Sequence, residues 1–346
     1  MSSPSGRHHP GTAASLLLLA YFDMWMANLD TWRSCLTELS VVFNEATGMD
    51  ESWITMSSRA NVQPGTQMHG TNSSHGGGQG SKMPAIPQNS EAYEQFRELH
   101  WSLVKMDVYQ SFLGSTAPLL RSNTDNKYPP RAPVGTLSTI HGTHDHLMLL
   151  LKRVAIFSES ERARKREPAS GAEDSSLAGS PQSYAWGEWD RLRRDFETFK
   201  DGLGPWFEPL ETDSSARIKS PFGPALQFRT YSVAGIWMNF YMGLVHLHRH
   251  DPTLPPQAVI AAGAVARRTE SLVDQIGRIA AGVIDKSSQP TDLNPAQGAV
   301  MIESCVPLFT VGAQVSSEVL ATLSTVQRML IISHNRSQMW LDETGC

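Results

Sequence analysis

Two short stretches of this sequence gather histidines at spacings that could bind a metal ion. In the first, LVHLHRHDP, His246, His248 and His250 alternate. Imidazole is a common metal ligand, but residues two apart on an α-helix point about 200° away from each other. His246 and His250 therefore share a helix face and could ligate a metal only with help from elsewhere, because the Glu of an HExxH motif is absent. We interpret the three as structural or surface histidines.

The second stretch, IHGTHDHL, places Asp145 among His141, His144 and His146. It matches a metal motif no better, and the same structural interpretation is favoured. A helical enzyme is the alternative, and convergence of its titratable groups in one cleft, with strongly shifted pKa values, would favour it. The best candidate groups for such a site are His141, Asp145, His246 and His250.

Other chemistry-bearing motifs are missing from the sequence. There is no G-x-S-x-G elbow and no dinucleotide-binding glycine pattern, and GGGQGSK ends in Ser-Lys where a phosphate loop needs Gly-Lys-Ser/Thr. Cys35, Cys305 and Cys346 are too few and too widely spaced for a disulfide framework or a zinc motif, which favours a reducing compartment. We therefore predict no catalytic, cofactor-binding or metal-binding residue, and a protein that is not an enzyme.

Composition is that of a globular protein with polar insertions. The chain has 346 residues, of which 40% are hydrophobic and 18% are charged, so the size of the core is not limiting. With 29 basic and 34 acidic residues the formal net charge is −5. This balance shows no bias toward nucleic acid or an anionic membrane.

Apolar residues recur at helical spacing through most of the chain, and no convincing period-two alternation indicates a strand. The clearest helix runs from Glu91 to Gly114, and its embedded Lys105 and Asp107 are interpreted as satisfied structural groups. The sequence predicts an all-α fold, a multi-helix bundle or solenoid-like domain. Further helices are expected at Gly11–Ala27, from Trp32 to near Gly48, from about His144 into the basic run ERARKRE, around Trp186–Phe199, at Ala225–His248, around Leu272–Val283, and from Pro295 through Leu330.

Two segments lack this periodicity. Ala46–Ser90 holds seven glycines among Ser, Asn and Gln, and residues 167–183 are similarly polar. Such segments bury too little surface to offset their ordering entropy, so we predict a disordered insert at 46–90 and a flexible insert at 167–183. Both would interrupt a single helical domain over residues 1–346.

One helix could be mistaken for a membrane span. Thr230–His248 contains no Lys, Arg, Asp or Glu, which reaches the lower length limit for a spanning helix. Asn239 and His246 lie inside it, and Gly235 and Gly243 offer places for close helix packing. We predict a buried core helix, with a membrane-associated protein as the alternative.

Several segments together resemble the fungal-specific regulatory domain of zinc binuclear-cluster transcription factors, also called the middle homology region. HWSLVKMDVYQSFLG is similar to its central helix, and SLLLLAYFDMWMANLDTWRSCLTELSVVF to its tryptophan-opened helix pair. WGEWDRLRRDFETFKDGLGPWFEPL and PFGPALQFRTYSVAGIWMNFYMGLVHLHRHDP resemble the helices that follow, and SQMWLDETG the closing segment. The order and spacing of these pieces carry the resemblance.

The resemblance implies a regulatory domain in the nucleus that controls transcription. The family's six-cysteine zinc cluster and coiled coil are absent here, and the first helices of the domain are expected to be missing, so DNA contact would need a module absent from this chain. We expect protein partners of the transcription machinery or a homo-oligomer, a possible small-molecule effector held among aromatic residues, and no membrane. ERARKRE (Glu161–Glu167) would be either a nuclear-import signal or a solvated helix end.

Overall fold

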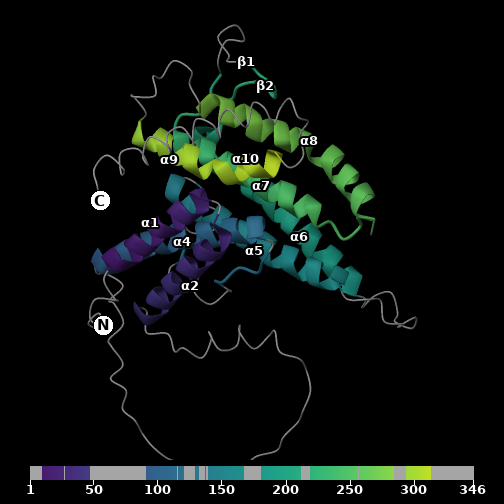
Figure 1. Ribbon diagram of the computed structural model, residues 1–346. Helices are drawn as coiled ribbons and strands as arrows, with labels where there is room; N and C mark the ends of the chain where they lie inside the picture. The colour runs from purple at the N-terminus through teal and green to yellow at the C-terminus, as the bar shows by residue number, and fades with distance from the viewer. Residues whose placement is uncertain are drawn as a thin grey trace, which may run out of the picture. The chain divides into compact units, whose positions relative to one another are not determined.

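The fold of the protein is all-α, as predicted (Figure 1). The computed structural model describes residues 10–26, 28–46, 91–114, 116–120, 129–131, 137, 139–166, 181–211, 219–255, 257–283 and 294–312. Its helices are α1 (Pro10–Trp25), α2 (Leu29–Ala46), α4 (Glu91–Gly114), α5 (Ile140–Arg166), α6 (Pro181–Asp201), α7 (Tyr231–Arg249), α8 (Ala258–Val283), α9 (Pro295–Glu303) and α10 (Cys305–Gly312). A 3₁₀ turn (Pro205–Phe207) and two short strands, β1 (Lys219–Ser220) and β2 (Gly223–Pro224), complete the described elements.

The chain divides into two compact units. Unit 1 comprises residues 1–110 and 118–129, and unit 2 comprises residues 111–117 and 130–346. Helix α4 therefore contributes residues 91–110 to unit 1 and its last turn to unit 2. The expectation of a single domain over residues 1–346 stays a prediction.

Unit 1 is built on the predicted helix pair α1–α2 and on α4. Trp32, Leu36 and Leu39 of α2 are fully buried at three- and four-residue steps, which is the spacing of one helix face. Helix α4 has the predicted bounds. Its Asp107 is 1% exposed, and its two carboxylate oxygens accept the backbone N–H groups of Leu119 and Leu120, each at 2.9 Å. Asp107 thus holds the chain that follows the helix, in agreement with a structural role.

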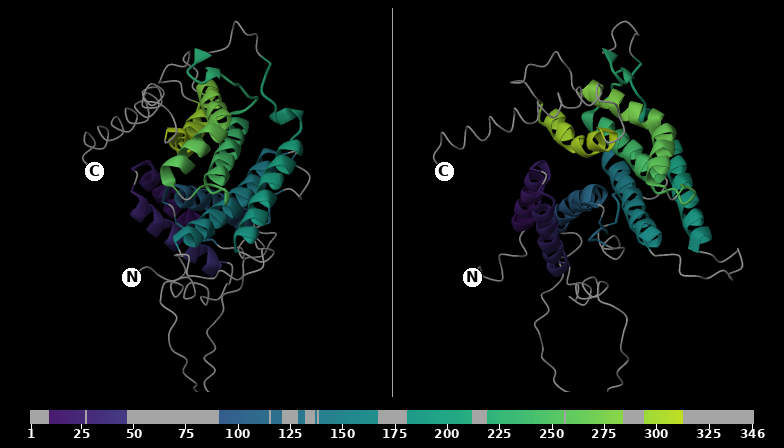
Figure 2. Two further views of the ribbon diagram at one scale, coloured as in Figure 1. Left: turned by 90° about the vertical axis from the view of Figure 1, so that its right-hand side faces the viewer. Right: turned by 45° about the vertical axis from the view of Figure 1, so that its right-hand side comes forward.

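Unit 2 is organised around α7, which packs against α5, α6, α8, α9 and α10. Figures 1 and 2 show α8 lying alongside α7. Gly243 permits the packing of α7, because a Cβ there would clash with the side chains of Leu151 and Phe196. Gly235 is different, since its nearest neighbour, Val300, would be at an ordinary 3.7 Å. No helix in the described part of the chain combines the length and apolar character needed to cross a bilayer.

The predicted start of this helix at Ala225 is wrong. Helix α7 begins at Tyr231, after Thr230, whose side chain caps it by accepting the Val233 N–H at 3.3 Å. The preceding residues are not helical and instead lie against α8, where the Leu226 N–H donates to the Arg278 carbonyl at 2.9 Å. The β1–β2 hairpin leads into this segment, with Gly223 at a φ of 104° that favours glycine.

Other boundaries also differ from the sequence expectation. Helix α6 begins at Pro181, so residues 181–183 are helical and do not belong to the flexible insert predicted for 167–183. Ala46 is the last residue of α2 and likewise is not part of the insert predicted for 46–90. The remainders of both inserts, 47–90 and 167–180, lie outside the described residues. So does the predicted helix beyond residue 312, with Val319 and Leu330.

Candidate functional site

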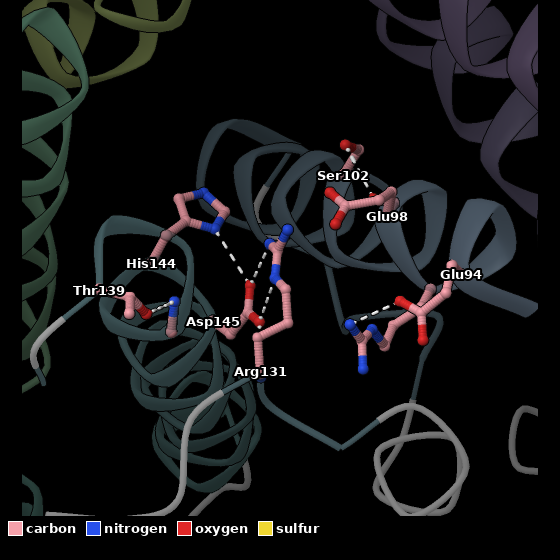
Figure 3. Close-up of polar contacts among 9 residues, drawn as sticks. Glu94, Glu98, Ser102, Arg131, Thr139, His144 and Asp145 are labelled. Atoms are coloured by element: carbon pink, nitrogen blue, oxygen red, sulfur yellow. Dashed lines mark hydrogen bonds and ion pairs between the residues drawn. The ribbon is translucent and has the colours of Figure 1, made fainter. Parts of the chain in front are cut away.

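The histidine-rich stretch IHGTHDHL opens helix α5, and its Asp145 is paired with an arginine (Figure 3). Thr139 caps the helix by accepting the Gly142 N–H at 3.1 Å. Asp145 is fully buried, and its carboxylate accepts two hydrogen bonds from the Arg131 guanidinium. Nε donates to Oδ2 at 2.9 Å and Nη2 donates to Oδ1 at 2.7 Å. The Arg131 backbone N–H adds a third bond at 3.0 Å. His144 Nδ1 lies 3.6 Å from the same carboxylate.

This pairing fixes the charge of Asp145. Burial alone raises the pKa of its carboxyl, but the hydrogen bonds from Arg131 and His144 outweigh that effect, and the pKa is lowered below the ordinary value. A carboxylate held this way is a poor proton acceptor and has its oxygens occupied. It anchors residue 131 to the start of α5.

Arg131 was not singled out from the sequence. It follows Pro130 in a proline-rich connection and lies fourteen residues before its partner, so no helical spacing links the two. The sequence named Asp145 but gave no signal for its partner, because burial of the carboxylate, which creates the need for a cation, is seen only in the fold.

The histidine-rich stretch LVHLHRHDP ends helix α7, where burial favours the neutral form of two of the histidines. The His246 ring stacks on Phe112, with centroids 4.0 Å apart and an interplanar angle of 8°. Its Nε2 lies 3.3 Å from Thr310 Oγ1. Because the Thr310 hydroxyl donates its proton to the Val306 carbonyl, His246 Nε2 must be the donor in this contact. Burial, followed by the nearby Arg249, His250 and Arg162, holds the pKa of His246 well below its usual value.

His250 lies one turn further along the same face, as predicted. Its Nδ1 donates to the His246 carbonyl at 2.9 Å, which leaves Nε2 as the lone-pair nitrogen. That lone pair faces Arg162 Nη1 at 3.4 Å, so a donor occupies the position that a metal would need. Burial lowers the pKa of His250 to about 4, with Arg162 adding to the effect.

His248 points toward another helix. Its ring lies edge-on to that of Trp189, with centroids 5.9 Å apart, and the Trp189 indole donates to the Leu247 carbonyl at 3.1 Å. Burial also lowers the pKa of His248. The triplet is therefore divided between two faces of α7, as the helical geometry predicted.

The four groups proposed for a helical enzyme do not converge. His250 contacts Arg162, near the C-terminal end of α5, whereas Asp145 is near its N-terminal end. At about 1.5 Å per residue, the seventeen residues between positions 145 and 162 span about 25 Å. His141, next to Asp145, is exposed. Within the described ranges, no three His, Cys, Asp or Glu side chains are grouped so as to hold a metal ion.

Helices α5 and α6 border an open groove with a volume of about 420 Å³. Ile156 and Phe157 of α5 and Tyr184 and Ala185 of α6 form its apolar lining. Tyr184 is 73% exposed. Sequence reasoning identified both helices but not the groove, because the groove depends on how the helices pair.

The charges at the edge of this groove are paired. Arg153 donates to Asp195 at 2.6 Å and to Glu188 at 3.4 Å. Arg164 makes a bidentate contact with Glu161, at 2.9 and 2.8 Å, and these hydrogen bonds raise the pKa of Arg164.

The basic run ERARKRE is helical through Arg166, the last residue of α5. Arg162 faces His250, and Arg164 is committed to Glu161. Lys165 and Arg166 are exposed. The interpretation as a solvated helix end describes these last two residues, and nuclear import through them stays a prediction.

Comparison with known proteins gives no relative: no protein-family model, curated protein or solved structure matches this chain. The functional argument therefore rests on the residues themselves. In unit 2, Asp145 and the α7 histidines are engaged with internal partners, and the α5–α6 groove is open to solvent.

Proposed function

We propose that this chain is a helical regulatory domain that acts in transcription by binding other proteins, without catalysing a reaction. The observation that carries the proposal is the open α5–α6 groove, where exposed Tyr184 stands beside an apolar lining. Tyrosine and arginine are enriched at the residues that dominate binding energy in protein interfaces. The order of helical motifs that resembles the fungal regulatory domain supplies the transcriptional part of the proposal.

The proposed partners are components of the transcription machinery or a second copy of the chain. A small-molecule effector would use the same groove, whose volume falls within the range of ligand sites. Contact with DNA is assigned to a separate DNA-binding module, and the proposed location is the nucleus. Exposed Lys165 and Arg166 favour that location, because import receptors recognise short basic runs.

A tethering assay tests the regulatory function. The full chain is fused to a bacterial DNA-binding domain and expressed in yeast with a reporter gene that carries the matching operator. We expect reporter transcription to change several-fold relative to the DNA-binding domain alone. Unchanged transcription, with the fusion present in the nucleus at equal abundance, would contradict the proposal.

A second assay tests the proposed location separately. The full chain fused to a fluorescent protein should accumulate in the nucleus of a fungal cell, and the double substitution Lys165→Gln and Arg166→Gln should reduce that accumulation. Exclusion of the unsubstituted fusion from the nucleus would overturn the location.

A further inference from the structure

We propose that the α5–α6 groove binds an acidic amphipathic segment of a partner protein, an inference that rests on the proposed function and names the chemistry of its partner. The groove lies between two neighbouring helices and is open to solvent. Small-molecule sites usually bury most of the ligand surface, which an open groove does not. A groove between helices suits an amphipathic helix that inserts its apolar face.

The apolar lining supplies the anchor site. Ile156 and Phe157 come from α5, and Tyr184 and Ala185 from α6. Ala185 is small and fills little of the groove, which leaves room for a partner side chain. Tyr184 is largely exposed and offers an aromatic surface at low entropic cost, because its side chain has few rotatable bonds.

The charge around the groove selects an acidic partner. The acids at its edge, Glu161 and Glu188, already lie against Arg164 and Arg153. The last two residues of α5, Lys165 and Arg166, are basic and exposed, so this end of the helix carries an excess of positive charge. A helix C-terminus is equivalent to about half a negative charge, which is too little to offset the excess. A basic or neutral partner would gain nothing from this end of the groove.

The test uses a fluorescein-labelled peptide with apolar residues at i, i+3, i+4 and i+7 and Asp or Glu elsewhere. A companion peptide carries Lys at every acidic position. Fluorescence anisotropy with the full chain at low salt should show the acidic peptide binding at least about tenfold more tightly than its companion, with the difference shrinking as salt is raised. Equal affinity for the two peptides would overturn the proposal.

Two matched pairs of variants locate the binding site. Tyr184→Ala should weaken binding by at least about fivefold, whereas Trp186→Ala, an exposed aromatic on another face of α6, should change it less than about twofold. Lys165→Glu should weaken binding by about threefold or more, and Lys200→Glu, at the far end of α6, should have little effect. Circular dichroism melts confirm that each variant is folded, and loss of binding in the control variants to the same extent as in the groove variants would overturn the assignment.

Three further outcomes decide between the possible ligands of the groove and separate this inference from the proposed function. Displacement of the peptide by low concentrations of decanoate would assign the groove to a small apolar acid and overturn the peptide proposal. If the peptide does not bind while the tethered chain still changes reporter transcription, the regulatory function stands and the groove assignment fails. If the peptide binds at the groove and the reporter is unaffected, the regulatory function fails instead.

Discussion

The start of α5 and the end of α7 have similar compositions and opposite electrostatics. At the start of α5, the fully buried Asp145 carboxylate keeps its charge because the Arg131 guanidinium donates two hydrogen bonds to it. At the end of α7, His246 and His250 have no carboxylate among the causes of their pKa shifts, and burial beside arginines keeps both rings neutral. The difference shows that histidine spacing does not identify a metal site. Whether a histidine can bind a metal depends on whether its nitrogen lone pair is still unoccupied after the chain has folded.

The two regions should also differ in how much stability a single change removes. A buried ion pair broken on one side leaves an uncompensated charge in the interior, whereas a buried neutral ring loses one hydrogen bond or one stacking contact. The predictions below use that contrast, beginning with the largest effect.

Removal of the arginine at the start of α5 should be the most damaging change. Arg131→Ala leaves the fully buried Asp145 carboxylate without its guanidinium partner, and we expect a loss of about 3–5 kcal/mol in the free energy of unfolding, measured by urea titration. Arg153→Ala serves as the control, because Arg153 is 41% exposed and its pairs with Glu188 and Asp195 should contribute about 1 kcal/mol or less. Equal losses of unfolding free energy in the two variants would contradict a buried Arg131–Asp145 ion pair.

Acidification should act first on the end of α7. In the unfolded chain a histidine binds a proton near pH 6.5, whereas His250 in the folded chain does so only near pH 4. Between these values the unfolded state holds more protons, so stability should fall as pH is lowered, by up to about 1.4 kcal/mol per pH unit for each histidine kept neutral.

The start of α5 should respond in a lower pH range. The pKa of Asp145 is lowered from 3.8, so its stabilising effect is complete above that value and is lost only as pH falls through the folded pKa. Urea titrations from pH 7 to pH 4.5 should therefore report the histidines and not Asp145, and His250→Gln should reduce the dependence of stability on pH. A flat profile of the unsubstituted chain over this range would be the opposite of what the burial of these rings predicts.

A smaller effect should follow from removing one acceptor. Thr310→Val keeps the shape of the side chain but leaves the His246 Nε2–H without its acceptor, and we expect a loss of about 1–2 kcal/mol. Thr198→Val, at an exposed position of α6, is the control and should change the free energy of unfolding very little. A stabilising effect of Thr310→Val would mean that His246 does not donate to this hydroxyl.

The smallest expected effect on stability is that of adding zinc. His246 donates through one nitrogen and His250 has its lone pair opposed by Arg162, so a metal would have to displace both contacts. Addition of Zn²⁺ to the full chain should leave its melting temperature unchanged at micromolar concentration. A zinc-dependent rise that disappears in His250→Gln would establish a metal site at this end of α7.

Local signals in the sequence were enough to predict much of the fold. Helix α4 has the expected bounds, and the shared face of His246 and His250 follows from helical periodicity. The start of α7 could not be predicted, because Leu226 is held against α8 by a hydrogen bond to Arg278, far along the chain. Apolar residues at 225–230 look the same whether they continue a helix or pack against one.

The candidate sites were predictable to a lesser degree. Sequence reasoning named Asp145 but not Arg131, because the cation comes from a connection without periodicity. It also gave both helices of the α5–α6 groove without the pairing that creates the groove. In each case the missing information was long-range, and a single sequence carries little of it.

The central claim is that these polar side chains are fully engaged with partners inside the fold. Its most direct test is a ¹⁵N NMR titration of the histidine rings in the full chain. The account predicts that His250 stays neutral with its proton on Nδ1 until the pH approaches about 4, and that His246 remains neutral with its proton on Nε2. Titration of either ring near pH 6.5, or a change of tautomer on addition of Zn²⁺, would contradict the account.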